Sequence, residues 1–384
     1  MRQIENIFIF VSDSLRWDYL PDTVRSKGIT LKTVAASCYS APSFSSLSTG
    51  RYPQSHGVSR WDDQVSEDIP TIFDIDGFES GFHQESGEVN KEALYSILRL
   101  ESDVDPSDIS SPFILMERDL QPHVPFTSSP ATSAREYYKI NKNNWKRIKQ
   151  EYKESCEESV KKFEKRLEIL DNEDLLDTTL CIFTSDHGEL LGEYGEAGHS
   201  SPATPELVYV PSTLIHPQLE ESDLEIDQDQ VIEAVDIIET AINAVGEPDF
   251  DTDGVNLLEN KRSRDWAYNR VNIEISNNSF YTADSMWWED SGYTHQINHI
   301  FKRITAAMYR ILKGPERTAV RRSPVEVIKI YMRKTNQFGS PPISKRDGIV
   351  RLTEFANEIT NKNPDNVDIS EDTEDRLKEL GYLE

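Results

Sequence analysis

The chain has 384 residues, enough to bury a large hydrophobic core, and its 41 Lys and Arg against 68 Asp and Glu give a formal charge of −27. This excess of carboxylates repels phosphate backbones and argues against a nucleic-acid-binding protein. Together with a mean hydropathy of −0.59, the acidity is typical of proteins from salt-loving organisms, in which carboxylates keep the surface hydrated and salt screens their repulsion. An acidic metal-binding protein is the alternative.

Cysteine usage and the N-terminus predict where the protein resides. Cys38, Cys156 and Cys181 lie far apart and form no CxxC pair, which indicates reduced, buried thiols. The first residues pass into an apolar run without the small-residue cleavage site of a signal peptide. No apolar stretch reaches the roughly 18 residues needed to cross a bilayer. We therefore expect a cytoplasmic protein without a transmembrane segment.

The first expected element is a strand over residues 4–11, where nearly every position is apolar, as in a parallel strand buried on both faces. Asp13 and Ser14 follow directly. Ligands of open α/β sheets bind beyond the carboxyl ends of the strands, so Asp13 is well placed to hold a metal ion. Taken alone, Asp13 also suits the N-cap of a helix.

Residues 38–58 read CYSAPSFSSLSTGRYPQSHGV and predict a short helix that begins near Ser40. Pro42 suits the first turn of a helix, and Gly50 is a natural terminator just beyond Thr49. The Ser40 hydroxyl would then stand at a helix N-terminus, where free N–H groups and the helix dipole favour an alkoxide or an anionic ester. The alternative is an ordinary Ser/Pro loop that caps a helix.

A helix over residues 88–100 and a second buried strand over residues 111–117 are expected next. His123 and Pro125 follow that strand. His123 is either a surface turn residue or a substrate-facing imidazole, and the restriction that Pro125 places on the loop favours the second interpretation. Residues 145–170 carry apolar side chains at helical spacing, which predicts a covering helix with a charged, solvated face.

A further strand is expected over residues 177–184 and is followed by Asp186 and His187. An adjacent carboxylate and imidazole at a strand end form a combination that binds divalent cations. His199 lies in a Gly-His-Ser-Ser loop ahead of a strand expected at residues 208–215. A helix over residues 231–244 should close the core.

The pattern changes beyond a turn-rich hinge, and we place a domain boundary near residue 262. Residues 271–275 and 279–288 alternate like a small antiparallel sheet. Residues 295–313 combine an apolar stripe with basic side chains, and they begin a positive island that extends to Lys334. This island is either a helix packed on the core with salt bridges to the acidic surface, or a lid that attracts an anionic polymer or a lipid surface.

Several of these segments resemble the motifs of the sulfatase family of the alkaline phosphatase superfamily. SAPS at residues 40–43 with LSTGRYP at residues 47–53 resembles the nucleophile signature, and HVP at residues 123–125 resembles the central HxP motif. The strand ends at Asp13 and at residues 184–189 resemble the metal-binding motifs. Residues 372–384 are similar to the usual C-terminal phrase of the family. The resemblance covers the whole chain and is strongest up to about residue 215.

The resemblance implies an α/β fold, the alkaline-phosphatase-like three-layer sandwich with a central, mainly parallel sheet. It assigns residues 1–262 to a catalytic domain and residues 263–384 to a smaller C-terminal α+β subdomain. It implies one divalent metal ion, with ligands drawn from Asp13, Ser14, Ser40, Asp186 and His187.

The resemblance also implies the roles of the remaining residues. Ser40 would be the nucleophile, either unmodified or matured to formylglycine, and Arg51 would orient it or add positive potential. His123 and His199 would hold the oxygens of the ester and assist the leaving group. Glu189 and Glu193 fit the family only as neighbours of the metal motif, and we assign them no role.

Three departures from the family pattern leave the reaction open. Ser14 stands where the family has a second Asp, Phe44 stands where it has an Arg, and an Asp-His pair replaces Asp-Asn. The family as a whole favours hydrolysis of sulfate monoesters with Ca²⁺, whereas the departures favour phosphoryl-transfer relatives that use unmodified Ser40 and Mn²⁺ or Zn²⁺, which accept imidazole better.

A third hypothesis is a degenerate member that binds a glycan or a partner protein without turning it over. The expected ligand of the enzyme is a sulfated or phosphorylated small molecule or glycan. Residues 295–334 are additionally expected to make at most weak contact with a membrane surface.

Overall fold

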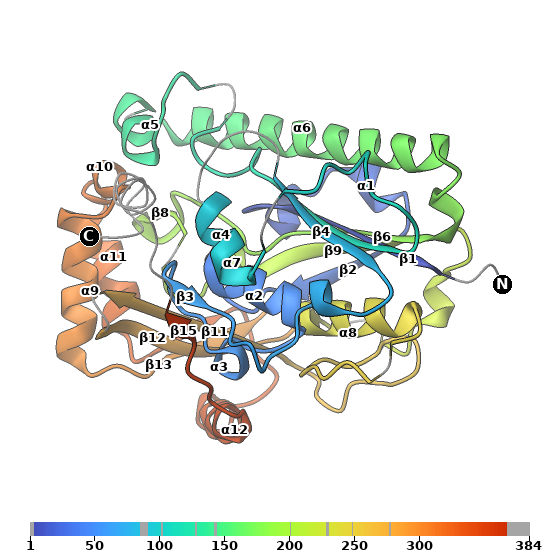
Figure 1. Cartoon of the computed structure of the whole chain (residues 1–384). Coiled ribbons are helices and arrows are strands. Elements are labelled where there is room, and N and C mark those ends of the chain that lie inside the picture. Colours follow the sequence, from blue (N-terminus) through green and yellow to red (C-terminus); the bar gives the residue numbers. More distant parts are fainter. Residues whose placement is uncertain are drawn as a thin grey trace.

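The computed structural model of the chain describes residues 4–84, 91–100, 103–126, 129–141, 144–199, 201–227, 230–247, 249–275 and 278–366. A central sheet lies between two layers of helices, and a second, smaller sheet stands beside it (Figure 1). The α/β three-layer sandwich expected from the sequence is confirmed.

The central sheet has seven strands in the order β10-β2-β9-β6-β1-β5-β4. Their bounds are Ile232–Glu233, Ile29–Val34, Tyr209–Ile215, Thr179–Thr184, Asn6–Ser12, Phe113–Asp119 and Glu79–Gln84, in that order. Neighbouring strands run parallel, except that β9 is antiparallel to both β2 and β6. The sheet is therefore mainly parallel, and the ends of β6, β1 and β5 that carry polar residues lie side by side.

Alternation along β1 explains why its sequence is apolar throughout. Ile7 and Ile9 point into one core cluster, and Phe8 and Phe10 point into another on the opposite face. The first cluster is covered by α2 (Ser40–Thr49), α4 (Lys91–Leu98) and α8 (Ala234–Ala244). The second is covered by α6 (Trp145–Asn172), α5 (Ala134–Asn141) and α1 (Asp22–Arg25), and the long α6 runs along one side of the molecule in Figure 1.

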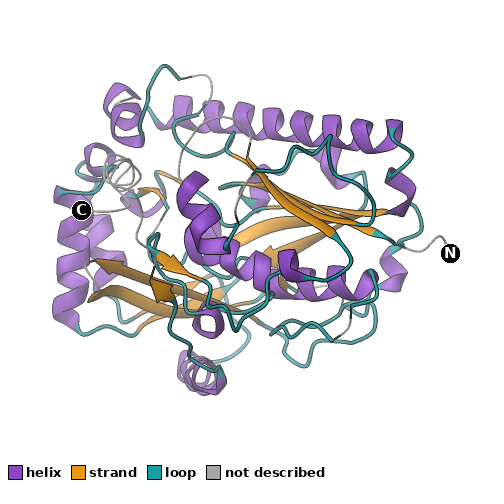
Figure 2. Ribbon diagram, viewed as in Figure 1, coloured by secondary structure: helices purple, strands orange, loops and turns teal. Residues whose placement is uncertain are grey.

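The smaller sheet is antiparallel, as expected, and contains β11 (Ala267–Ile275), β12 (Asn278–Trp287), β13 (Gly292–Gln296) and β14 (Thr335–Phe338). The helices of this region are α9 (Ile300–Leu312), α10 (Arg317–Val320), α11 (Pro324–Met332) and α12 (Lys345–Glu358) (Figure 2). Shorter elements complete the described chain: α3 (Pro53–His56), β3 (Asp63–Gln64), β7 (Leu190–Leu191), β8 (Ala197–Gly198), α7 (Pro205–Val208) and β15 (Asp365–Asn366).

The regions around the two sheets are joined by a common hydrophobic core cluster. One core cluster combines Val34 and Cys38, from the first part of the chain, with Trp287 and Ala307 from the last part. The boundary expected near residue 262 falls in the connection between α8 and β11, and the division into two domains there stays a prediction.

Several expected bounds shift in the structure. Residues 88–90 of one expected helix and the tail at residues 372–384 lie outside the described residues. Ile232–Glu233 pair with β2, so the helix expected from residue 231 begins only at Ala234. His295 and Gln296 pair within the small sheet, so the basic helix begins at Ile300.

Candidate active site

Strand order explains why residues far apart in the sequence meet at one edge of the central sheet. Asp13 follows β1, His123 follows β5, and Asp186 and His187 follow β6, and these three parallel strands are neighbours. The chain after β2 leads into α2, whose first residue is Ser40. Carboxyl ends of parallel strands meet at the same edge, so the topology gathers these side chains.

Asp13, Asp186 and His187 form a buried group whose ligand atoms all lie within 4.8 Å of one another. The backbone N–H of Ser14 donates to Asp186 Oδ1 at 3.1 Å. His187 Nδ1 lies 2.9 Å from the carbonyl oxygen of Gly188, so a proton on Nδ1 leaves Nε2 as the metal-binding nitrogen. Asp186 Oδ2 is buried and accepts no hydrogen bond from the described residues. The donor set and this carboxylate oxygen fit a divalent cation.

The two carboxylates of this group differ in their electrostatic surroundings. Burial opposes the ionisation of Asp13, but the Arg118 guanidinium and the neighbouring imidazoles together outweigh burial and hold the pKa of Asp13 well below its usual value. Burial, followed by the charge of Asp13, raises the pKa of Asp186 to about 6. Two buried carboxylates repel each other, and a bound cation relieves this repulsion.

Ser40 lies against this group. It is the first residue of α2, follows Tyr39 in an extended conformation, and is fully buried. Its Oγ is 3.5 Å from Asp13 Oδ2 and 3.3 Å from His187 Nε2. At the other end of the helix Gly50 adopts the left-handed conformation with φ of 65°, which explains the glycine at this position. The structure therefore brings a helix N-terminal hydroxyl to the candidate metal ligands.

His123 and His199 complete one side of the site. Their ring centres are 5.1 Å apart, and His199 is 4.5 Å from the ring of His187. Burial lowers the pKa of His123 to about 3 and the pKa of His199 well below its usual value, so both rings are neutral at pH 7. They retain 5% and 6% exposure, whereas Ser40 and Asp13 have none. The two imidazoles are therefore slightly more exposed than Ser40 and Asp13.

Arg51 and Ser14 do not lie as expected. Arg51 follows the C-terminal end of α2, roughly 15 Å along the helix from Ser40, and its guanidinium pairs with Asp251. The expectation that Arg51 orients Ser40 is wrong, because the helix separates them. Ser14 donates its hydroxyl to Asp13 Oδ1 at 2.8 Å, and in this arrangement it positions a candidate ligand.

Arg118 is the cation that the sequence analysis missed. It belongs to β5, is fully buried, and forms an ion pair with Asp13 through Nε at 2.8 Å and Nη2 at 2.5 Å. Its guanidinium carbon is 5.2 Å from the centre of the Phe44 ring. Arg118 thus brings a positive charge next to the position where the family pattern has an Arg and this chain has Phe44. Only the pairing of β1 with β5 reveals this neighbourhood.

Glu189, to which the sequence analysis assigned no role, also lies in the site. Its Oε2 is 3.2 Å from His199 Nδ1, and its Oε1 is buried without a hydrogen-bond partner among the described residues. Burial raises the pKa of Glu189 to about 8. It interacts with Ser14, the residue that stands in place of the second Asp of the family. Its position in the sequence, three residues after Asp186, was the only indication that Glu189 would lie near the candidate metal ligands.

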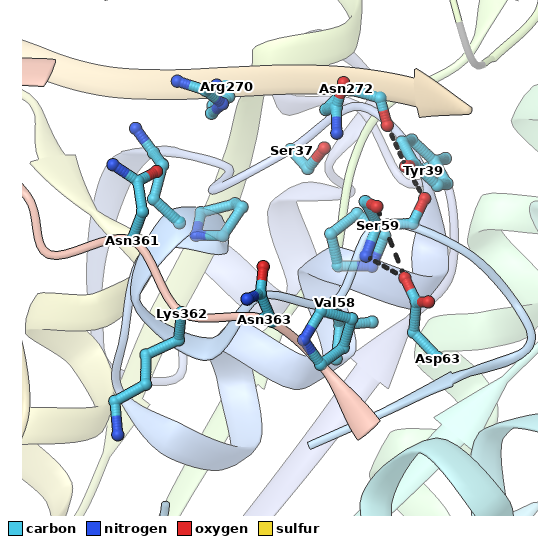
Figure 3. A pocket seen from close by; sticks show the side chains of 15 residues that line it. Ser37, Tyr39, Val58, Ser59, Asp63, Arg270, Asn272, Asn361, Lys362 and Asn363 are labelled. Carbon is cyan, nitrogen blue, oxygen red and sulfur yellow. Dashed lines mark hydrogen bonds between the residues drawn. The ribbon is translucent and has the colours of Figure 1, made fainter. Parts of the chain in front are cut away.

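A pocket of about 240 Å³ lies behind the first turn of α2. Figure 3 shows Arg270 and Asn272 of β11 on one side and Asn361, Lys362 and Asn363 on the other. Tyr39 and Pro42 line this pocket, whereas Ser40, between them in sequence, points toward Asp13 and His187. The pocket therefore borders the nucleophile helix but is separate from the buried group.

Comparison with known proteins identifies the family. A family model named Sulfatase matches residues 92–247. The chain is also 33% identical to the "Low-salt glycan biosynthesis sulfotransferase Agl7" of Haloferax volcanii, over 99% of this chain and 96% of that protein. The chain belongs to the sulfatase family. The resemblance on which the sequence analysis depended is confirmed.

Solved structures support the fold of this sulfatase-family chain. BT1596, a 2-O GAG sulfatase, matches with a TM-score of 0.60 at 13% identity, over 94% of this chain and 95% of that one. The phosphonate monoester hydrolase of Agrobacterium radiobacter matches with a TM-score of 0.59 at 14% identity, over 85% and 96%. At such identities the likeness concerns the fold, which both kinds of enzyme share.

Proposed function

We propose that this sulfatase-family protein is a metal-dependent enzyme that acts on sulfate monoesters through Ser40. The observation that carries the proposal is the position of Ser40 Oγ at the start of a helix, 3.5 Å from Asp13 Oδ2 and 3.3 Å from His187 Nε2. A hydroxyl in such surroundings is suited to nucleophilic attack, because the site stabilises its anion.

The metal would be held by Asp13, Asp186 and His187, with Ser40 as a further ligand and Ser14 and Glu189 nearby. When bound, such a cation lowers the pKa of a neighbouring hydroxyl and neutralises charge on the ester oxygens. Ca²⁺ is the expectation from the family, and the imidazole of His187 favours Mn²⁺ or Zn²⁺. Metal identity is therefore one variable of the experiment below.

The protein side chains divide the reaction between them. Ser40 Oγ attacks the sulfur, the bond from sulfur to the alcohol oxygen breaks, and the proton of the Ser40 hydroxyl passes to that oxygen, so that a neutral alcohol leaves. His123 and His199, which are neutral, hold the sulfuryl oxygens and assist this proton transfer. The sulfuryl group then passes from Ser40 to an acceptor hydroxyl. Arg118 keeps Asp13 ionised and in place through their ion pair.

The acceptor decides whether the enzyme is a hydrolase or a transferase. Water as acceptor gives hydrolysis, and a sugar hydroxyl gives transfer. The Haloferax volcanii relative is named a glycan sulfotransferase, which supports a glycan as the substrate or the acceptor. The pocket beside Tyr39 offers Gln54, Asn272, Asn361 and Asn363, and amide groups are suited to hydrogen bonds with sugar hydroxyls. Because the pocket is separate from the buried group at Ser40, it suits a part of the glycan that does not react there.

The chemistry of the surface and of the cysteines supports the remaining expectations. The three cysteines are buried and free, which fits a reducing, cytoplasmic location. The charge of −27 fits a protein that works at high salt.

Turnover of an aryl sulfate tests the proposal. The protein is stripped of metal and reloaded separately with Ca²⁺, Mn²⁺ and Zn²⁺, and we expect activity only after reloading. Ser40→Ala should lower kcat roughly 10⁴-fold or more. Ser43→Ala is the matched control, since Ser43 is buried one turn further along α2 and its hydroxyl has no partner among the described residues. Equal activity of the two variants would refute the role of Ser40.

Two further measurements separate the alternatives. Faster turnover of an aryl phosphate than of the sulfate would assign the enzyme to phosphoester hydrolysis or transfer, which Phe44 and Ser14 favour. Intact-mass analysis of the Ser40 peptide shows whether the residue is formylglycine. A disaccharide added to the sulfate assay should accumulate as a sulfated product if the enzyme is a transferase.

A further inference from the structure

The apolar stripe of helix α9 faces solvent and not the core. Phe301, Ile304, Met308 and Leu312 recur at spacings of three and four and face solvent, Phe301 with 72% and Leu312 with 50% exposure. The buried side of the helix carries Ala306, Ala307, Arg303 and Arg310. The alternative of a helix packed on the core with salt bridges thus fits the buried side of α9, but most of the apolar stripe faces outward.

The buried arginines explain this orientation. Arg310 donates to Glu196 at 2.8 Å and to Glu316 at 2.8 Å, and Arg303 donates to the carbonyl oxygen of Met332 at 2.8 Å. These contacts fasten α9 to the neighbouring β8 and α11. Breaking a buried ion pair leaves an uncompensated charge, so these contacts help to keep the arginine side of α9 inward. The expected salt bridges to acidic residues are present, but the apolar stripe is left outside.

The exposed apolar side chains of the described residues concentrate here. Of the nine large ones, four lie on α9, Val325 and Ile328 lie on the neighbouring α11, and Ile297 lies just before α9. Surface apolar residues scattered singly need no explanation, but exposed apolar side chains gathered on two packed helices indicate an interaction surface.

Basic residues frame this stripe. Lys334 Nζ donates to the carbonyl oxygen of Ile297 at 3.1 Å, at one end, and Arg321 donates to the carbonyl oxygen of Leu312 at 2.8 Å, at the other. Lys329 and Arg333 of α11 line a pocket of about 330 Å³. Residues 297–334 contain ten Lys or Arg and only two Glu, in a chain whose net charge is −27. Arg303 and Arg310 are buried, so eight of these ten basic residues remain to give the surface around α9 and α11 a positive charge.

We propose that α9 and α11 form a docking surface for an anionic lipid bilayer. A helix that exposes Phe, Ile, Met and Leu beside Lys and Arg lies in the interface of such a bilayer, with the apolar side chains below the headgroups. A hydrated anionic polymer would match the charges but not the apolar stripe, so the lipid surface fits both observations. Among the described residues no helix is long and apolar enough to cross a bilayer, and the contact is peripheral.

The lipid surface would lie one helix away from the candidate active site. Arg310 of α9 also donates to the carbonyl oxygen of Ala197, two residues before His199. Docking through α9 would therefore hold the loop that carries His199 near the bilayer.

Co-sedimentation of the full chain with vesicles tests this proposal. We expect binding to vesicles that contain phosphatidylglycerol and much weaker binding to pure phosphatidylcholine. Phe301→Ser with Met308→Ser should weaken binding by about tenfold or more. Ile140→Ser with Val350→Ser is the matched control, since these two apolar side chains are 44% and 49% exposed on α5 and α12, and it should bind like the unchanged protein.

A charge series supplies a second readout. Arg322→Glu with Lys329→Glu should weaken vesicle binding at low salt. In molar KCl the double variant and the unchanged protein should bind alike, because salt screens surface charges. Lys153→Glu with Lys165→Glu, on the exposed face of α6, is the control. Absence of vesicle binding would overturn the proposal, as would binding unaffected by the apolar variant. Retention by dextran sulfate without vesicle binding would assign the face to an anionic polymer, and dimerisation abolished by the apolar variant would assign it to a second copy.

Discussion

At the scale of single residues, the site depends on contacts between positions that no local pattern relates. Asp13 forms an ion pair with Arg118, which is 105 residues away in the sequence. Phe44 occupies the position of the arginine in the family signature, and the Arg118 guanidinium lies beside its ring. The positive charge that the signature lost is thus present near Ser40, but it comes from a strand and not from the nucleophile helix.

Arg118→Gln is expected to lower kcat roughly 100-fold to 1000-fold with little change in KM, because a charge that acts on the developing anion is lost. Arg118→Lys should recover part of kcat, because it restores the charge without the two-pronged contact to Asp13. Steady-state kinetics with the aryl ester, together with calorimetric titration of the metal, measure both effects. Equal losses in the two variants, accompanied by an equal fall in Tm, would indicate that Arg118 only supports the fold.

At the scale of elements, one buried carboxylate joins the central sheet layer to the small sheet. Glu233 caps α8 and accepts the backbone N–H of Tyr268 in β11 at 2.5 Å. Arg262 and Arg264 each lie 3.1 Å from its Oε1. Burial opposes ionisation of Glu233, but Arg262 and Arg264 outweigh it and lower its pKa to about 2 from 4.5. These contacts hold α8 and β11 together.

The pH dependence of stability follows from this shift. A carboxyl whose pKa is lower in the folded state contributes stability above pH 4.5, and the contribution is lost as the pH falls toward 2. Glu233→Gln should lower the free energy of unfolding at pH 7 by roughly 3 kcal/mol and flatten its decline in that acid range. Denaturant titrations at pH 7 and pH 3 measure this, with the exposed Glu221→Gln as control. A parallel decline in both variants would contradict it.

At the scale of the whole molecule, charge is distributed unevenly. The chain carries −27 overall, while residues 297–334 are basic and expose most of the large apolar side chains of the described residues. Repulsion among surface carboxylates opposes the compact state, and salt reduces this repulsion. The acidic surface therefore affects the stability of the fold, and the basic segment at residues 297–334 is the proposed docking surface.

Raising KCl from about 0.2 M to about 2 M should increase Tm by on the order of 10 °C, because screening relieves the repulsion between carboxylates. Differential scanning calorimetry in a KCl series measures the change. Sucrose at matched osmolality is the control, since it carries no charge. A Tm that is independent of KCl would show that the acidic surface does not limit stability.

The sequence alone was sufficient for the features that are encoded locally. The apolar run before Asp13, the Pro and Gly that bound the helix at Ser40, and the polar residues after each strand follow from short-range preferences of the backbone and from burial on both faces. Neighbouring parallel strands then bring Asp13, Asp186 and His187 together without further information. The sandwich and the candidate metal ligands were predictable for this reason.

Only the tertiary structure decided the features that depend on competition between distant groups. Arg118 reaches Asp13 because β5 pairs with β1, and Arg51 is kept from Ser40 by the length of α2. Helix α9 is amphipathic in sequence, but periodicity does not say which side faces inward. In the fold Arg310 pairs with Glu196 and Glu316 on the inward side of the helix, and Glu196 is 114 residues away in the sequence, so a local pattern cannot reveal this pairing.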